Sequence, residues 1–148
     1  MDTKELGNLG ERLACEYLVG KGYNILGRNY KVKFGEIDII ARRKFKLLGK
    51  NDNTIHFVEV KTIIGSDGPD SQAIADPRPL RGRGFFPEQR VDYKKQRKLR
   101  QLCLIWLVKN KFAQNTPYQI DVLGVTISLV NQGADFHYFP NAIGDSYR

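Results

Sequence analysis

The sequence predicts a single domain that contains both α-helices and β-strands. Apolar residues recur at helical spacing near the N-terminus and again in the stretch 91–111, whereas β-branched runs lie between residues 34 and 61. The chain has 148 residues, a usual length for one domain with a core of its own. We therefore expect one domain over residues 1–148.

The first predicted element is a helix that ends at about Val19. Leucine, alanine and tyrosine side chains repeat along it at helical spacing, and Asp2 with Glu5 forms a capping pattern at its start. Gly7 and Gly10 are poor helix formers that each cost up to about 1 kcal/mol relative to alanine. Their presence suggests that another element approaches this helix closely.

Glu11 lies at the edge of the buried face of this helix, one turn from Gly7. Helix N-termini favour acidic residues through the helix dipole, so a solvated glutamate is the ordinary interpretation of this position. From spacing alone we favour that interpretation over a functional one.

A first strand is predicted over 23–32, and a β-hairpin follows it. Its two strands are the apolar runs Phe34 to Ala41 and Ile55 to Lys61, and the polar loop between them carries glycine and asparagine turn signals. Each run is interrupted by acids, among them Asp38 and Glu59. Glu59 and Lys61 share one face of their strand, because side chains two residues apart point the same way.

The hairpin carries the residues best suited to catalysis. Neighbouring strands lie about 4.8 Å apart, so a register that sets Asp38 beside Glu59 would let both carboxylates bind one Mg²⁺ or Mn²⁺ ion. Such an ion lowers the pKa of a bound water and polarises a phosphoryl oxygen, and the Lys61 ammonium can orient the water or neutralise developing charge. A solvated strand edge is the alternative, since acid-x-lysine triplets are common in charged chains. Because Asp38 and Glu59 lie in apolar runs where an unpaired charge is costly, both interpretations stay open.

The second half of the chain begins with an irregular segment, 64–90, rich in glycine, proline and arginine. We expect either a mobile basic lid or arm beside the active face, in which Arg81 and Arg83 contact nucleic acid, or a disordered surface insertion. A helix over 91–111 follows, and then strands over 118–129 and 136–139. We interpret Asp121, in an apolar run, as a structural acid.

The helix over 91–111 starts with a dense basic cluster. We expect part of this cluster, led by Lys95, to face nucleic acid, and the remainder to be solvent cover. The candidates are Lys94, Lys95, Gln96, Arg97 and Lys98.

Composition indicates a polyanionic partner. The chain has 24 basic and 16 acidic residues and a net charge of +8, which favours nucleic acid and, less strongly, anionic membrane surfaces. No apolar run is long enough for a signal peptide or a membrane span, so we expect a cytoplasmic protein without a membrane partner. Cys15 and Cys103 lie in helical apolar patterns without zinc-ligand spacing, so we expect reduced core residues.

The order of these motifs resembles that of a known family. The motifs are Glu11 on the first helix, Gly35-Glu36-Ile37-Asp38, Phe57 to Thr62, Lys95-Gln96, and Ile120-Asp121-Val122. Together they resemble the YraN-like family of small uncharacterised bacterial proteins. That family looks like a branch of the restriction-endonuclease-like superfamily, distantly related to archaeal Holliday-junction resolvases.

The resemblance implies an α/β fold, with a restriction-endonuclease-like mixed β-sheet flanked by α-helices. It implies that Asp38, Glu59 and Glu11 bind Mg²⁺ or Mn²⁺, that Lys61 acts beside them, and that Lys95 or Gln96 contacts the substrate. Ile63 and Gln119 stand where the family usually has arginine. These differences affect the expected path of the substrate and leave Asp38, Glu59 and Lys61 unchanged.

We therefore expect a metal-dependent nuclease, or a nuclease-like protein, that acts on DNA, including branched DNA. The alternatives are a nucleic-acid-binding module on the same fold that does not cut, and an interaction protein whose charge serves assembly. A homodimer is one option for the oligomeric state, because the related resolvases act as dimers and an exposed edge strand can support one.

Overall fold

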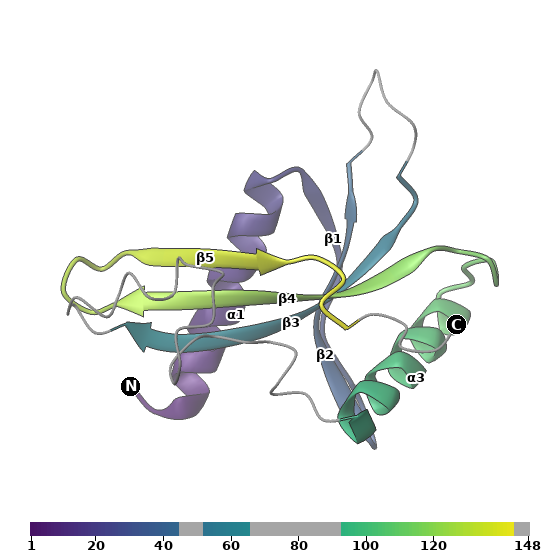
Figure 1. Cartoon of the computed structure of the whole chain (residues 1–148), viewed down its shortest axis with the longest axis horizontal. Helices are drawn as coiled ribbons and strands as arrows, with labels where there is room; N and C mark the ends of the chain where they lie inside the picture. Colours follow the sequence, from purple (N-terminus) through teal and green to yellow (C-terminus); the bar gives the residue numbers. More distant parts are fainter. Residues whose placement is uncertain (45–51, 66–92, 144–148) are drawn as a thin grey trace.

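The computed structural model describes residues 1–44, 52–65 and 93–143, and Figure 1 shows its elements. In chain order these are α1 (Thr3–Gly20), β1 (Tyr23–Val32), β2 (Gly35–Arg43), β3 (Ile55–Gly65), α3 (Tyr93–Lys109), β4 (Tyr118–Ser128) and β5 (Ala134–Phe139). One five-stranded sheet runs in the order β1-β2-β3-β4-β5. Among the described strands, β3 and β4 pair in parallel, and the other neighbours are antiparallel. The predicted mixed α/β sheet is confirmed.

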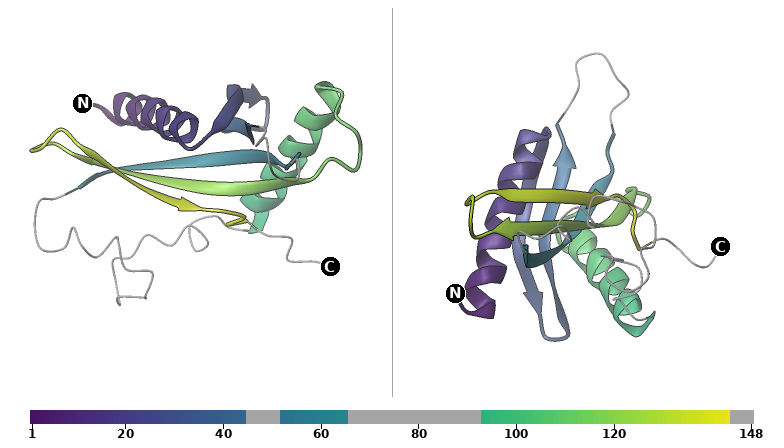
Figure 2. Two further views of the ribbon diagram at one scale, coloured as in Figure 1. Left: turned by 90° about the horizontal axis from the view of Figure 1, so that it is seen from above. Right: turned by 60° about the vertical axis from the view of Figure 1, so that its left-hand side comes forward.

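The two helices pack on opposite faces of the sheet. In β3, Phe57 belongs to a core cluster with α3, whereas the next residue, Val58, belongs to a cluster with α1. Successive strand residues point to opposite faces, so the two clusters form two layers of core. Figure 2 shows α1 running along the strands and α3 lying towards one end of the molecule.

Helix α1 is fixed at both its start and its middle. Asp2 and Glu5 form the predicted capping box, which satisfies two N–H groups of the first turn. Further along, a Cβ atom on Gly10 would lie 1.8 Å from Thr62 Oγ1 in β3, so only glycine allows this approach. A Cβ on Gly7 would meet no atom of the described residues within 4 Å. The close approach inferred from the two glycines is thus correct for Gly10 and wrong for Gly7.

One predicted boundary, the start of the irregular segment, needs correction. Ile64 and Gly65 continue β3 and pair with β4, so the irregular segment does not begin at residue 64. The rest of that segment, from 66, lies outside the described residues. The strand expected over 118–129 is present as β4, which runs without a break through Gly124 because each of its residues pairs with β3. The predicted edge strand is present as β5.

The positions of the two cysteines and the character of the described helices match what the sequence predicted. Cys15 and Cys103 are both free and buried, as predicted for core residues. Burial raises the pKa of the Cys103 thiol, which keeps it in the unreactive protonated form. Within the described ranges, no helix combines the length and the apolar character needed to cross a bilayer.

Candidate active site

Asp38 lies in β2, next to the point where the pairing of β2 with β3 ends. The β1–β2 register pairs Arg28 with Ile39 and Tyr30 with Ile37 but omits Asn29 and Asp38, and the β2–β3 register ends at Ile39. Asn29 has a φ of 49°, a left-handed conformation that asparagine adopts more readily than most residues. The register of β1 and β2 is the same on both sides of this position, and the shift in their pairing lies between Ile25 and Gly27.

The side chain of Asp38 bridges β2 and β3 where their pairing stops. Ile39 pairs with Val58, so one further step of the same register would set Asp38 opposite Glu59. Instead, Val60 N donates a hydrogen bond of 2.7 Å to Asp38 Oδ2. The carboxylate is therefore held beside β3, near Glu59, as the predicted metal site requires.

Glu59 is the centre of a small cluster of charges. Lys61 Nζ lies 2.6 Å from Glu59 Oε1, as expected for side chains two residues apart on one strand face. The first turn of α3 adds a second ammonium, because Lys95 Nζ lies 3.5 Å from the same oxygen. The exposed fractions are 11% for the Glu59 side chain and 31% for that of Lys61. Both groups thus lie at the margin of the core and within reach of solvent.

The carboxyl of Asp38 is electrostatically perturbed. Burial raises its pKa, the negative charge of Glu59 raises it further, and Glu11 adds to the effect. The hydrogen bond from Val60 and the charge of Lys61 act in the opposite direction, and the resulting pKa is about 7. Three carboxylates from α1, β2 and β3 therefore act on one region of the molecule.

The free carboxylate oxygens fit a hard cation. Among the described residues, neither Asp38 Oδ1 nor Glu59 Oε2 accepts a hydrogen bond, so each side chain retains an oxygen for a ligand. Mg²⁺ is usually held by one or two carboxylates, with waters and substrate phosphates completing its coordination. Two protein oxygens are thus sufficient for the predicted ion.

Glu11 does not complete a three-residue metal cage. No group of three or more histidine, cysteine, aspartate or glutamate side chains in the described part of the chain is arranged to hold a metal ion. Glu11 follows Gly10, whose contact with Thr62 fixes α1 against β3. Its charge acts on Asp38. This placement fits a role around the ion more closely than a role as a third direct ligand.

A pocket of about 320 Å³ opens beside Glu59. It lies between the β1–β2 turn and α3, and its lining residues are Phe34, Gly35, Glu36, Glu59, Lys95, Lys98, Leu99 and Leu102. Two of the predicted nucleic-acid-binding lysines, Lys95 and Lys98, therefore lie with the candidate metal ligand Glu59.

The other predicted contacts lie elsewhere. Lys94 and Arg97 are exposed on α3 but do not line this pocket, and Gln96 is half-buried. Arg81 and Arg83 lie outside the described residues. Phe34 also lines the pocket but was not among the predicted site residues; its sequence signal is an aromatic residue at a turn, between Lys33 and Gly35.

Asp121 belongs to a separate, buried polar cluster. It accepts hydrogen bonds from His56 Nδ1 at 2.7 Å, Gln119 Nε2 at 2.7 Å, the backbone N–H of Asn141 at 2.7 Å, and the hydroxyl of Tyr138. Burial by itself raises the pKa of Asp121, but these hydrogen bonds outweigh burial and lower it. A fully buried carboxylate with this many donors has a structural role, as its sequence context predicted.

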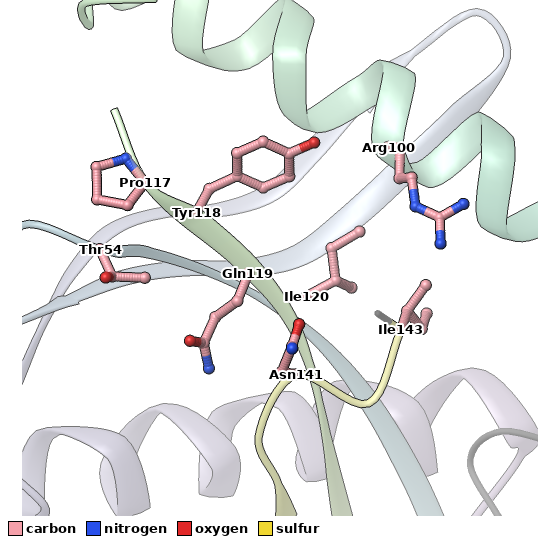
Figure 3. Close-up of a pocket in the computed structure, with 8 residues that line it drawn as sticks. All are labelled: Thr54, Arg100, Pro117, Tyr118, Gln119, Ile120, Asn141 and Ile143. Carbon is pink, nitrogen blue, oxygen red and sulfur yellow. The ribbon is translucent and has the colours of Figure 1, made fainter. Parts of the chain in front are cut away.

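A larger pocket, of about 500 Å³, lies between the start of β4, α3 and the segment after β5 (Figure 3). Arg100, Gln119 and Asn141 contribute polar groups to it. The described residues that line it include no carboxylate or histidine. It therefore lacks the groups that metal-assisted hydrolysis needs.

Comparison with known proteins assigns the chain to a family. Residues 10–125 match the uncharacterised protein family UPF0102. The chain belongs to the UPF0102 family. A UPF0102 protein of Dictyoglomus turgidum is 35% identical over 142 residues, covering 96% of this chain and 99% of the relative. One of Caldicellulosiruptor saccharolyticus is 36% identical over 143 residues, with the same coverage of 96% and 99%. The predicted resemblance to the YraN-like proteins is confirmed, and the matched range includes Glu11, Asp38, Glu59 and Lys61.

Similarity to solved structures is weak. The structure of Pyrococcus furiosus SfsA in complex with Ca²⁺ is 18% identical, with a TM-score of 0.34. The match covers 94% of this chain but only 64% of that chain, less than two thirds of its length. A similarity at this level supports no conclusion about fold or function.

Proposed function

We propose that this UPF0102 protein is a metal-dependent nuclease that hydrolyses phosphodiester bonds in DNA. The observation that carries the proposal is the junction of β2 and β3, where Asp38 is anchored to Val60 beside Glu59 and Lys61. Within the described ranges, each of these two carboxylates keeps one oxygen that accepts no hydrogen bond, and an ammonium lies beside them at the margin of the core. Phosphodiester hydrolysis uses such a set.

Each residue has a distinct part in the proposed reaction. Asp38 and Glu59 would hold the Mg²⁺ or Mn²⁺ ion, which when bound supplies Lewis-acid chemistry at the phosphate. Lys61 would position the attacking water and offset the negative charge that develops on the phosphoryl oxygens. The water oxygen bonds to phosphorus, one phosphorus–oxygen ester bond breaks, and the leaving oxygen takes up a proton. Glu11 would assist the ion or its waters.

The choice of DNA rests on charge and access. The chain carries a net charge of +8, and Lys95 and Lys98 lie at the pocket that contains Glu59. Cationic groups of this kind bind phosphates and release counterions, which supplies much of the affinity for nucleic acid. The phosphate backbone would thus be drawn towards the carboxylates in spite of their charge.

One observation favours a second candidate, a nucleic-acid-binding module that does not cut. Glu59 Oε1 is engaged by both Lys61 and Lys95, and such ion pairs can be purely structural. In that case, losing lysines and arginines would weaken binding, whereas losing Glu59 would leave function unchanged.

Cleavage assays distinguish the two candidates. Labelled single-stranded, duplex, flapped and four-way DNAs are incubated with Mg²⁺ or Mn²⁺ and the wild type, Glu59→Ala or Lys61→Ala. Glu16→Ala is the matched control, because Glu16 is an exposed glutamate of α1 that forms an ion pair with Arg12 on the surface of the helix. Metal-dependent cleavage that is lost in the first two variants and kept in the control supports the nuclease. Binding without cleavage on every substrate, unchanged by Glu59→Ala, refutes it and leaves the binding module.

A further inference from the structure

The turn between β1 and β2 presents an exposed aromatic ring at a fixed place. Phe34 is 46% exposed, and Val32 pairs with Gly35 across the two-residue turn. A Cβ atom on Gly35 would lie 2.8 Å from Leu102 Cδ1, so the turn packs tightly against α3. Lys31 and Glu36 form an ion pair of 3.0 Å at the base of the turn. Phe34 is thus positioned by its neighbours, although its ring is open to solvent.

Exposed phenylalanines are common on protein surfaces, but the surroundings of Phe34 are specific. Its side chain lines the same pocket of about 320 Å³ as Glu59, Lys95 and Lys98. The pocket therefore combines an aromatic ring, two ammonium groups and a candidate metal ligand. A nucleotide has matching parts, since its base has an apolar face and its phosphate is anionic.

We infer that this pocket accepts one unpaired nucleotide of the DNA, with its base against the ring of Phe34 and its phosphate beside Lys95 and Lys98. Within a continuous duplex both faces of a base are covered by its neighbours, so only an unstacked base can meet the ring. Proteins that bind single strands combine a positively charged groove with aromatic side chains in this way. The geometry thus points to DNA with an unpaired nucleotide near the scissile bond, such as a flap, a loop or the branch point of a junction.

The position of the nucleotide near a scissile bond rests on the proposed function, but the test of nucleotide binding is independent of cleavage. Binding of a labelled oligothymidylate and of a blunt duplex is measured by fluorescence anisotropy in EDTA, where no metal-dependent cleavage occurs. Phe34→Ala removes the ring, Phe34→Leu keeps an apolar side chain without a ring, and Phe34→Trp keeps a ring. Leu104→Ala is the matched control, because Leu104 is an exposed apolar residue of α3 that does not line the pocket.

Phe34→Ala and Phe34→Leu should each weaken single-strand binding by about 5- to 150-fold, the range expected for the loss of one stacked base. Phe34→Trp and Leu104→Ala should bind like the wild type, and duplex binding should be unchanged in all variants. Equal losses on both DNAs, no loss in Phe34→Ala, or no single-strand binding by the wild type would each overturn the inference. If Phe34→Ala loses single-strand binding and the wild type cuts none of the DNAs, the pocket assignment holds and the nuclease proposal fails.

Discussion

Replacing Gly10 or Gly7 of α1 by alanine should change stability in opposite directions. Both substitutions remove a glycine from the interior of a helix, which by itself stabilises a protein by up to about 1 kcal/mol. At Gly7 no steric clash opposes this gain in the part of the chain that the structure describes, because a Cβ there meets none of its atoms within 4 Å. At Gly10 the new Cβ would lie 1.8 Å from Thr62 Oγ1 and 2.7 Å from Thr62 Cβ, both on a strand residue.

The contact at Gly10 is too short for a side-chain adjustment alone. Thr62 Cβ cannot move without β3, so α1 must shift away from the sheet, and overpacking of this kind costs about 1–3 kcal/mol or more. The clash exceeds the helix gain, so we expect Gly10→Ala to lower the free energy of unfolding by about 1–2 kcal/mol net. Gly7→Ala should raise it by up to about 1 kcal/mol.

Urea unfolding followed by circular dichroism gives both values. A third variant, Gly10→Ala with Thr62→Ala, removes Oγ1 and Cγ2 but keeps the Thr62 Cβ position at 2.7 Å, so it should recover only part of the loss. A Gly10→Ala protein as stable as the wild type would refute the contact between α1 and β3. That result would also remove the basis for placing Glu11 near Asp38.

Three further predictions concern charge. Lys95→Ala and Lys98→Ala should each weaken DNA binding and reduce the slope of log K against log salt by about 1, whereas Lys109→Ala at the end of α3 should have a smaller effect. Anisotropy titrations at several salt concentrations measure these slopes, and equal slopes in all variants would contradict the prediction. In metal-free protein, burial and the charge of Glu59 raise the pKa of Asp38 from its ordinary value of 3.8 to about 7, so the contribution of Asp38 to stability falls as the pH rises through this window. Urea unfolding in EDTA at several pH values should show this fall in the free energy of unfolding for the wild type but not for Asp38→Asn. Parallel pH profiles of the free energy for the wild type and Asp38→Asn would contradict the prediction. The pKa of Asp121 is lowered, so its contribution is present above the unfolded pKa and is lost as the pH falls through the folded one. Asp121→Asn should therefore be less stable at neutral pH and approach the wild type in acid; a stability difference that grows in acid would show that the carboxylate network is wrong.

Much of the fold could be predicted because its signals are local. The capping box of Asp2 and Glu5, the helical stripe of α1 and the β-branched runs of β2 and β3 depend on residues close in sequence. The position of Ile64 and Gly65 could not be predicted this way. Their glycine-rich surroundings suggested a loop, but pairing with β4, distant in the chain, extends the strand.

In the candidate site, too, local features could be predicted from the sequence, whereas contacts between distant elements could not. Sequence spacing placed Glu59 beside Lys61, and the hairpin placed Asp38 near them. The bond from Val60 to Asp38, the four donors around Asp121 and the pocket at Phe34 depend on packing between distant elements. No local pattern encodes them. Whether the chain forms a homodimer stays a prediction.

The proposed function requires that Asp38 and Glu59 together hold a divalent cation. Calorimetric titration of metal-free protein with Mn²⁺ tests it directly, using Asp38→Asn, Glu59→Gln and the surface control Glu16→Gln. Asp38→Asn and Glu59→Gln keep the size of each side chain and remove only its charge, so folding should be preserved. We predict saturable Mn²⁺ binding by the wild type and by Glu16→Gln, and its loss in both site variants. Equal binding by all four proteins, or no binding by the wild type, would contradict the assignment.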